Sequence, residues 1–124
     1  MTGLVKSGFR DLNVSDLQIV RFVDPTGGST AIKIAKLAGI SKQAVGKSAD
    51  SLVLRKYLLR KPSDRDGREK MLVFSSKGER LLHSIIEIVL KIEEKYRATL
   101  GEAGFKELKE KLSLLLATHT KEKV

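Results

Sequence analysis

Residues 34–45 read Ile34-Ala-Lys-Leu-Ala-Gly-Ile-Ser-Lys-Gln-Ala-Val45, and this stretch decides the fold. It places a small residue, Ala35, four positions before Gly39 and ten positions before the apolar Val45. Two short helices that cross at a tight turn need a small residue at the crossing and a residue that adopts a left-handed conformation at the turn. They also need an apolar side chain that points back between them. The spacing therefore predicts a helix-turn-helix.

A charged hairpin is predicted directly after this motif. Residues 61–76 read Lys61-Pro-Ser-Asp-Arg-Asp-Gly-Arg-Glu-Lys-Met-Leu-Val-Phe-Ser-Ser76. Strand candidates at 58–61 and 71–74 flank the segment 62–67, which is rich in Pro, Ser, Asp and Gly, the residues of turns. A helix-turn-helix that runs into such a hairpin has the order of parts of a winged helix, a fold commonly used to bind duplex DNA.

Caps and glycine turns set the bounds of the predicted helices. The expected helices lie at about 15–23, 30–38, 41–57, 76–100 and 102–118. The residues that bound them are Ser15 in a capping box that ends at Gln18, Ser29 or Thr30, Gly39, Ser41, Ser76 in a capping box that ends at Glu79, and Gly101.

The fold class that follows is mainly α with a small β-wing. We expect one domain over residues 1–124, with a winged helix at about 15–75 and two long dimerisation helices at about 76–119. These helices carry apolar residues on a wider arc than one small domain covers, which predicts a homodimer. The alternative is a monomer that buries these faces against its own winged helix. The expected interface residues are Leu82, Ile85, Val89, Leu108, Leu112 and Leu115.

The net charge of +9 is concentrated in the middle of the chain. Residues 31–70 carry 11 Lys and Arg and 4 Asp and Glu, whereas residues 1–30 are neutral and residues 71–124 have a net charge of +2. A polyanion is the natural partner of such a segment. The alternative is a solvated basic face without a ligand.

The composition excludes several classes of protein. The chain contains no cysteine, which excludes disulfides, thiol redox chemistry and thiolate zinc sites. His83 and His119 lie in separate helical patterns, so we expect no metal site and no cofactor. The motifs of nucleophilic enzymes and of phosphate-binding loops are absent from the sequence, so we expect a non-enzyme. The chain also lacks an apolar run of the roughly 18 residues that a membrane helix needs, and its N-terminus lacks a signal-peptide core. We therefore expect a cytoplasmic protein without a membrane partner.

The second helix of the motif offers candidate DNA contacts near its N-terminus. If this helix enters the major groove, its first exposed side chains reach the base edges. Gln43 can pair with adenine, and Lys42 and Lys47 can contact guanine or phosphate. Ser41 and Ser48 lie beside them and complete the predicted set.

The hairpin offers a second set of candidates. An arginine at a hairpin tip can enter the minor groove, where narrow tracts concentrate negative potential. Arg65 and Arg68 at the tip, and Lys61 at the base, are therefore predicted DNA contacts. Asp66 is predicted to organise the wing by holding Arg68. Asp50, on the preceding helix, would repel phosphate, so we expect it to pair with a nearby arginine.

From about Ser15 to Leu82 the chain resembles the multiple-antibiotic-resistance regulator (MarR) family of winged-helix transcription factors. The residues that carry the resemblance are 34–45, then Asp50 and Leu52, then Asp66-Gly-Arg68, and then Phe74-Ser-Ser-Lys-Gly78. The most specific feature is the Asp-x-Arg pair followed by an apolar-Ser/Thr-x-x-Gly helix start. In that family the wing Asp and Arg interact and the Arg meets the minor groove, which implies these roles for Asp66 and Arg68.

The resemblance implies a sequence-specific, dimeric regulator that binds double-stranded DNA, most commonly as a repressor. Recognition helix 41–57 would occupy the major groove, and wing 61–74 the minor groove. Many relatives bind small aromatic acids, so the resemblance allows a small-molecule effector, although aromatic residues make up only 5% of this chain. The alternative function is a winged-helix adaptor in a protein complex, without specific DNA binding.

Two departures from the family pattern have structural consequences. The family usually has glycine where this chain has Lys56, at the end of the recognition helix. Lys56 must therefore adopt that geometry at some energetic cost, or the helix ends differently. The family also has a longer first helix, which joins the dimer interface, whereas few residues precede Ser15 here.

Overall fold

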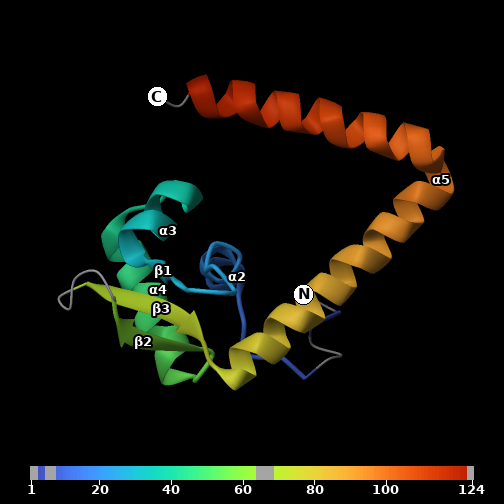
Figure 1. The fold of residues 1–124 in the computed structure, drawn as a ribbon. Helices are drawn as coiled ribbons and strands as arrows, with labels where there is room; N and C mark the ends of the chain where they lie inside the picture. Colours follow the sequence, from blue (N-terminus) through green and yellow to red (C-terminus); the bar gives the residue numbers. More distant parts are fainter. Residues whose placement is uncertain (1–2, 5–7, 64–68, 123–124) are drawn as a thin grey trace. The chain divides into compact units, whose positions relative to one another are not determined.

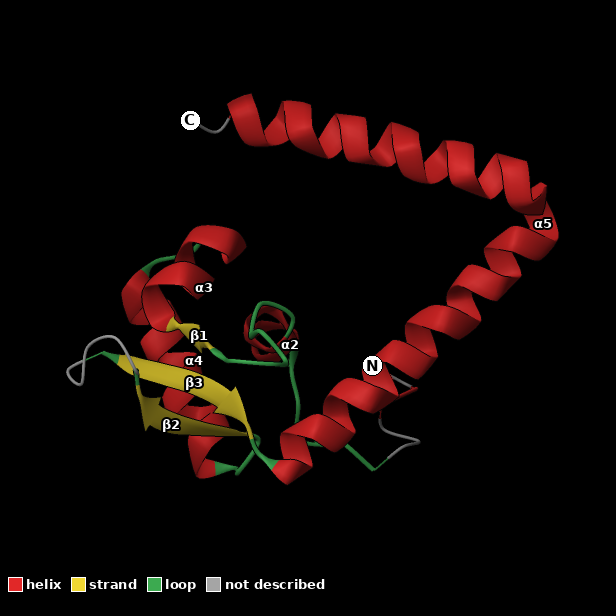
Figure 2. Ribbon diagram, viewed as in Figure 1, coloured by secondary structure: helices red, strands yellow, loops and turns green. Residues whose placement is uncertain are grey.

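The structure, a computed structural model, describes residues 3–4, 8–63 and 69–122 (Figures 1 and 2). The chain divides into two compact units, Met1–Ile85 and Ile86–Val124. The predicted fold class, mainly helical with a small β-wing, is confirmed. In chain order the elements are α2 (Val14–Val20), β1 (Ser29–Thr30), α3 (Ala31–Ala38), α4 (Lys42–Leu54), β2 (Leu58–Pro62), β3 (Lys70–Phe74) and α5 (Ser76–Glu122).

The sheet is antiparallel, with its three strands in the order β1-β3-β2. The predicted β2–β3 hairpin is present, and Leu58 of β2 lies opposite Phe74 of β3. Strand β1 was not predicted, because two residues are too few for a recognisable alternation. Gly28 permits this pairing: its φ is +80°, and a Cβ there would lie 2.6 Å from the carbonyl oxygen of Leu72.

Three predicted helix bounds are confirmed. The Thr30 hydroxyl caps α3 by accepting from the Lys33 amide. Gly39 ends α3 in the left-handed region, at φ 71°. The Ser41 hydroxyl then caps α4 by accepting from the Ala44 amide at 3.0 Å. These short-range signals fix the turn between the two helices.

Four other predicted bounds were wrong by a few residues, and one of them is the end of α2, which lies at Val20 and not at about residue 23. Helix α2 is capped by Asn13, in a reciprocal pair with Asp16, and not by Ser15. Helix α5 is capped by Ser75, whose hydroxyl accepts from the Gly78 amide, and not by Ser76. In both places neighbouring polar residues compete for the cap, and local spacing does not separate them. Helix α4 ends at Leu54 instead of Tyr57, because the chain turns at residue 56.

The core of the first unit draws on helices α2, α3 and α4, which pack against one another, and on the sheet and the start of α5. Its fully buried side chains all have less than 2% of their surface exposed. They include Ile19 and Val20 from α2, Ile34 from α3, Val45 and Leu52 from α4, Leu58 from β2, and Leu81 from α5.

The second unit consists of the remainder of α5, which is interrupted at Gly101. Gly101 has φ 76° and ψ 166°, a region that is essentially restricted to glycine. The predicted break between two C-terminal helices is therefore present at this glycine. Phe105 packs across the break on Tyr96, with ring centroids 6.2 Å apart, and is 5% exposed.

Candidate nucleic-acid interface

The helix-turn-helix is built as the spacing predicts. Ile34 and Val45 are completely buried, and Ala35 is nearly so. The Ala35 carbonyl accepts from the amides of both Gly39 and Ile40, which closes the end of α3 tightly. The start of α4 is thereby fixed relative to α3.

Helix α4 presents a polar N-terminal surface. Its apolar residues Val45, Ala49 and Leu52 are buried against the first unit. The five residues predicted to reach DNA lie outside this buried face, with the first four exposed and the last half-buried: Ser41, Lys42, Gln43, Lys47 and Ser48. The N-terminus of the helix adds the partial positive charge of its free amides, which favours an anionic ligand.

Gly46 lies within α4, and nothing in the described part of the chain requires a glycine there. A Cβ at this position would meet no described atom within 4 Å. Glycine destabilises a helix interior by about 1 kcal/mol relative to alanine. Position 46 thus carries an energetic cost without a packing reason inside the fold.

The acidic residue on this helix is paired, as expected. The guanidinium of Arg60, on β2, lies 2.6 Å from the carboxylate of Asp50. This ion pair joins α4 to the wing strand and offsets the one negative charge of α4. The surface of α4 that remains is positive or neutral.

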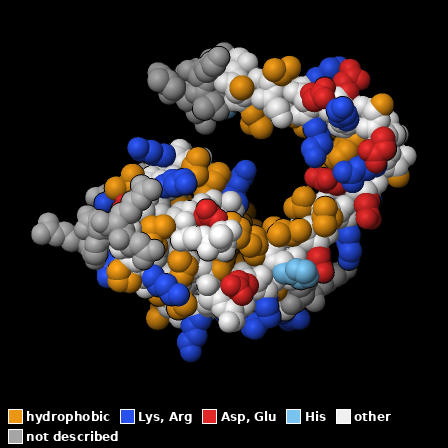
Figure 3. Space-filling model, in the orientation of Figure 1, with side chains coloured by type: hydrophobic (Ala, Val, Ile, Leu, Met, Phe, Trp, Pro, Cys, Tyr) orange, Lys and Arg blue, Asp and Glu red, His pale blue; other side chains and the backbone are white. Residues whose placement is uncertain are grey.

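The base of the wing adds further lysines. Lys61, on β2, and Lys33, on α3, line the same shallow groove together with Thr30 and Glu69. In the view of Figure 3, lysine and arginine side chains are scattered over the surface of the first unit. Lys33 and the exposed Lys36 were not among the predicted contacts. The only sequence signal for them was the positive charge of residues 31–70.

The predicted tip residues Arg65, Asp66 and Arg68 lie outside the residues that the structure describes. The Asp66–Arg68 interaction therefore stays a prediction. Within the described residues, His, Cys, Asp and Glu side chains form no group of three that could hold a metal ion. Among the helices in this described part, none is long and apolar enough to span a membrane.

A cluster of charged residues lies where α4 ends, and the sequence pattern did not reveal it. The Arg55 guanidinium donates to the Asp16 carboxylate at 2.9 Å and to the Asp11 carbonyl at 2.5 Å. The buried Tyr57 hydroxyl donates to the Asp11 carboxylate at 2.5 Å. This hydrogen bond lowers the pKa of Asp11, and burial, followed by the same bond, raises the pKa of Tyr57 to about 12. The Asp16 hydrogen bond raises the pKa of Arg55. At neutral pH the cluster thus contains a charged Asp11 and a neutral Tyr57.

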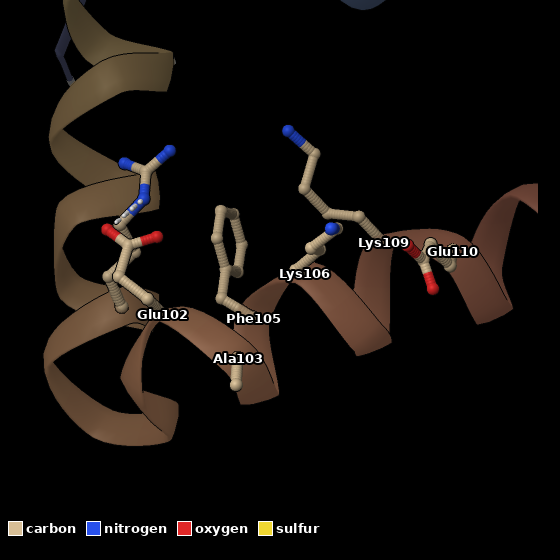
Figure 4. Close-up of a pocket in the computed structure, with 7 residues that line it drawn as sticks. Glu102, Ala103, Phe105, Lys106, Lys109 and Glu110 are labelled. Atoms are coloured by element: carbon tan, nitrogen blue, oxygen red, sulfur yellow. Dashed lines mark ion pairs between the residues drawn. The ribbon is translucent and has the colours of Figure 1, made fainter.

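The second unit carries a charged pocket around Phe105 (Figure 4). Phe105 and Lys109 project to the same side of the helix that follows Gly101. The Arg97 guanidinium lies 4.9 Å from the Phe105 ring centroid and 3.4 Å from the Glu102 carboxylate. These contacts clamp the bend at Gly101.

An apolar groove lies in the same unit. Its lining includes five large hydrophobic residues that this unit exposes, together with the buried Phe105: Val89, Ile92, Tyr96, Leu108 and Leu112. The surface of this groove is almost entirely apolar.

Three solved structures illustrate the fold that this chain shares. The transcriptional regulator Tm0710 from Thermotoga maritima is 23% identical, with a TM-score of 0.63 over 98% of this chain and 83% of that chain. A single-residue mutant of MepR from S. aureus, bound to an oligodeoxyribonucleotide, is 19% identical, with a TM-score of 0.64 over 94% of this chain and 84% of that chain. CouR from Rhodococcus jostii RHA1, bound to p-coumaroyl-CoA, is 18% identical, with a TM-score of 0.71 over 92% of this chain and 78% of that chain.

At these identities the solved structures establish the fold. A search of curated protein sequences found no match. Residues 10–69, which span the helix-turn-helix and most of the wing, match the sequence profile described as the MarR family. The part of this chain that carries the helix-turn-helix and most of the wing, residues 10–69, therefore matches the MarR family.

Proposed function

We propose that this chain is a sequence-specific, dimeric repressor that binds double-stranded DNA. The observation that carries the proposal is the exposed N-terminal surface of α4, which stands on a completely buried apolar face. On this surface the amide of Gln43 can read a base edge, and the ammonium groups of Lys42 and Lys47 can neutralise phosphates. Ser41 and Ser48 flank them. This helix would occupy the major groove.

The wing would occupy the minor groove. Lys61, at its base, is exposed and can neutralise a phosphate. We propose that Arg65 and Arg68 reach into the groove and that Asp66 holds Arg68, as the family resemblance implies. Lys33 shares a groove with Lys61 and extends the positive surface from the wing to α3.

The second unit supports a dimer. Three of its predicted interface residues are 38–49% exposed (Val89, Leu108 and Leu112), and Leu115 is 65% exposed. Leu82 and Ile85, at the start of α5, are half-buried within the first unit. Water-exposed apolar surface on this scale is characteristic of an interface. A second copy would cover it and would set two recognition helices about one turn of DNA apart.

The proposal also implies a mode of action, a location in the cell and a further partner. The protein would act by occupying DNA and not by catalysis, and it would do so in the cytoplasm. A small-molecule effector is a further proposed partner: the CouR structure contains p-coumaroyl-CoA, and the second unit of this chain has an apolar groove of its own. Effector binding would change the affinity for DNA through coupling between the two sites.

The experiment that tests the proposal is fluorescence anisotropy at two salt concentrations. The probe is the DNA immediately upstream of the protein's own gene, and the competitor is a scrambled duplex. A preference for the upstream DNA that survives higher salt is expected of a sequence-specific regulator. The Lys42→Ala variant should weaken binding, whereas Lys91→Ala, which removes an exposed lysine from the second unit, should not. Equal weak binding to both duplexes that disappears with salt would favour the adaptor function instead.

A further inference from the structure

Lys56 occupies a backbone conformation that normally belongs to glycine. Its φ is +69°, and it is the one non-glycine residue with a positive φ in the described part of the chain. A side chain with a Cβ is strained in this region, because the Cβ approaches the neighbouring carbonyl oxygen. Lys56 lies between the end of α4 and the start of β2, so its conformation sets the direction in which the chain leaves the recognition helix.

The residue before Lys56 is held by its side chain. The Arg55 guanidinium donates to Asp16 at 2.9 Å, to the Ser51 hydroxyl at 2.9 Å and to the Asp11 carbonyl at 2.5 Å. Asp16 is itself 3% exposed and is fixed as part of the α2 capping box. Arg55 thereby ties the last turn of α4 to the N-terminus of α2.

The residue after Lys56 is held equally firmly. Tyr57 is 1% exposed, and its hydroxyl donates to the same Asp11 whose carbonyl accepts from Arg55. The Lys77 ammonium lies 4.2 Å from the centroid of the Tyr57 ring. The Tyr57 amide also donates to the Leu52 carbonyl, which anchors it to α4.

The start of α5 binds all three carbonyls of this turn. The Lys77 ammonium donates to the Arg55 carbonyl at 3.0 Å. The Ser75 hydroxyl lies within hydrogen-bonding distance of the Lys56 carbonyl (2.5 Å) and of the Tyr57 carbonyl (3.0 Å). Gly78 allows this approach, since a Cβ there would lie 2.1 Å from the Tyr57 carbonyl oxygen.

We infer that Arg55 is a positioning residue for DNA binding: with Asp11, Asp16 and Tyr57 it holds Lys56 in the left-handed conformation and so fixes α4 relative to the wing. The inference rests on the proposed function, because α4 and the wing are the two elements proposed to contact DNA. The contacts that hold the turn come from segments that are distant in the sequence. Position 56 also lacks the glycine that would adopt the left-handed conformation without strain. The Arg55 cluster replaces that glycine.

The test combines a disruption with a specific rescue. Arg55→Met should lower the affinity for the upstream DNA by about tenfold, the size of effect expected when a coupled contact is lost. Adding Lys56→Gly should restore most of that loss, because glycine adopts the left-handed conformation without the cluster. Arg10→Met is the matched control: it removes the same charge from an exposed arginine outside the cluster and should leave the affinity close to wild type.

A measurement without DNA separates this inference from the proposed function. Hydrogen exchange of the Tyr57 amide reports on the turn itself, and it should accelerate in Arg55→Met and slow again when Lys56→Gly is added. If the wild type does not bind DNA but the exchange follows this pattern, the proposed function fails while the holding of the turn stands.

Two results would overturn the inference: unchanged exchange and affinity in Arg55→Met, or a loss that Lys56→Gly does not restore. If Arg55→Met does not fold, Asp11→Ala, with and without Lys56→Gly, serves in its place, since it removes the carboxylate that pairs with Arg55 and accepts from the Tyr57 hydroxyl.

Discussion

The two units of this chain differ in how much of their apolar side-chain surface is buried. In the first unit the helices and the two longer strands all contribute hydrophobic residues to one core, and Ile19, Ile34 and Leu52 are fully buried. Among the described residues of the second unit, Phe105 is the one buried hydrophobic side chain. Most of the exposed large hydrophobic residues of the described chain also lie in this unit.

The difference distinguishes apolar surface that the fold buries by itself from apolar surface that it leaves exposed. The first unit buries enough apolar surface to hold its own shape, so its exposed residues are available for a ligand. The second unit has two helical segments with a broad apolar face, and a bend clamped by a few contacts around Phe105. A partner surface that covers this apolar face would therefore stabilise it.

The largest expected effect is a loss of the proposed dimer when a charge is introduced on this apolar face. Leu112→Glu would bury an unpaired carboxylate in each half of the interface, and an uncompensated buried charge costs about 3–5 kcal/mol. Analytical ultracentrifugation should then show the monomer mass. Ser113→Glu, which adds the same charge at the adjacent exposed position, should remain dimeric.

Leu82→Glu is a second variant for the same question, at the start of α5. An unchanged sedimentation coefficient in both Leu112→Glu and Leu82→Glu would contradict the dimer and would favour a monomer. The contrast between the two units would then need another partner for the exposed helices.

The next effect tests the core of the first unit. Ile34→Ala removes a completely buried side chain, so the free energy of unfolding should fall by about 2–5 kcal/mol. Leu115→Ala, at a position 65% exposed, should cost much less at concentrations where the chain is monomeric. Urea denaturation at two protein concentrations measures both. Equal losses at low concentration would remove the distinction between the units.

The sequence predicts those parts of the fold that short-range chemistry controls. Thr30, Gly39 and Ser41 each act within four residues of the helix end that they define, so the helix-turn-helix could be placed correctly. The β2–β3 hairpin could be predicted equally well, because turn residues separate its two strands. The exposed residues of α4 follow from the same pattern.

The remaining features depend on contacts between distant segments. Strand β1 exists because Gly28 lets it approach β3, and a two-residue strand has no periodicity of its own. Arg55 meets Asp16 across 39 positions in the sequence, and neither residue is marked by its neighbours. The wing tip is predicted from its turn residues and its arginines as well as by resemblance, and its residues lie outside the described structure.

A smaller effect distinguishes base recognition from phosphate binding on α4. Gln43→Ala should cost about 1–3 kcal/mol of binding free energy on the preferred site and should reduce the discrimination between bases at one position. Lys47→Ala should instead weaken binding to all sequences and lower the salt dependence by about one released ion. Anisotropy titrations over a series of salt concentrations and single-base variants separate the two. A uniform loss with Gln43→Ala would assign this side chain to the DNA backbone.

The smallest expected effect has opposite signs for stability and for binding. Gly46→Ala should raise the free energy of unfolding by about 1 kcal/mol, because alanine is the better helix former and the described chain leaves open space for its Cβ. If DNA approaches α4 closely at this position, the same methyl group should weaken binding. Thermal unfolding and anisotropy on the same preparation measure the two changes. A gain in stability with unchanged affinity would show that glycine is merely tolerated there and would place the DNA contacts of α4 on other residues.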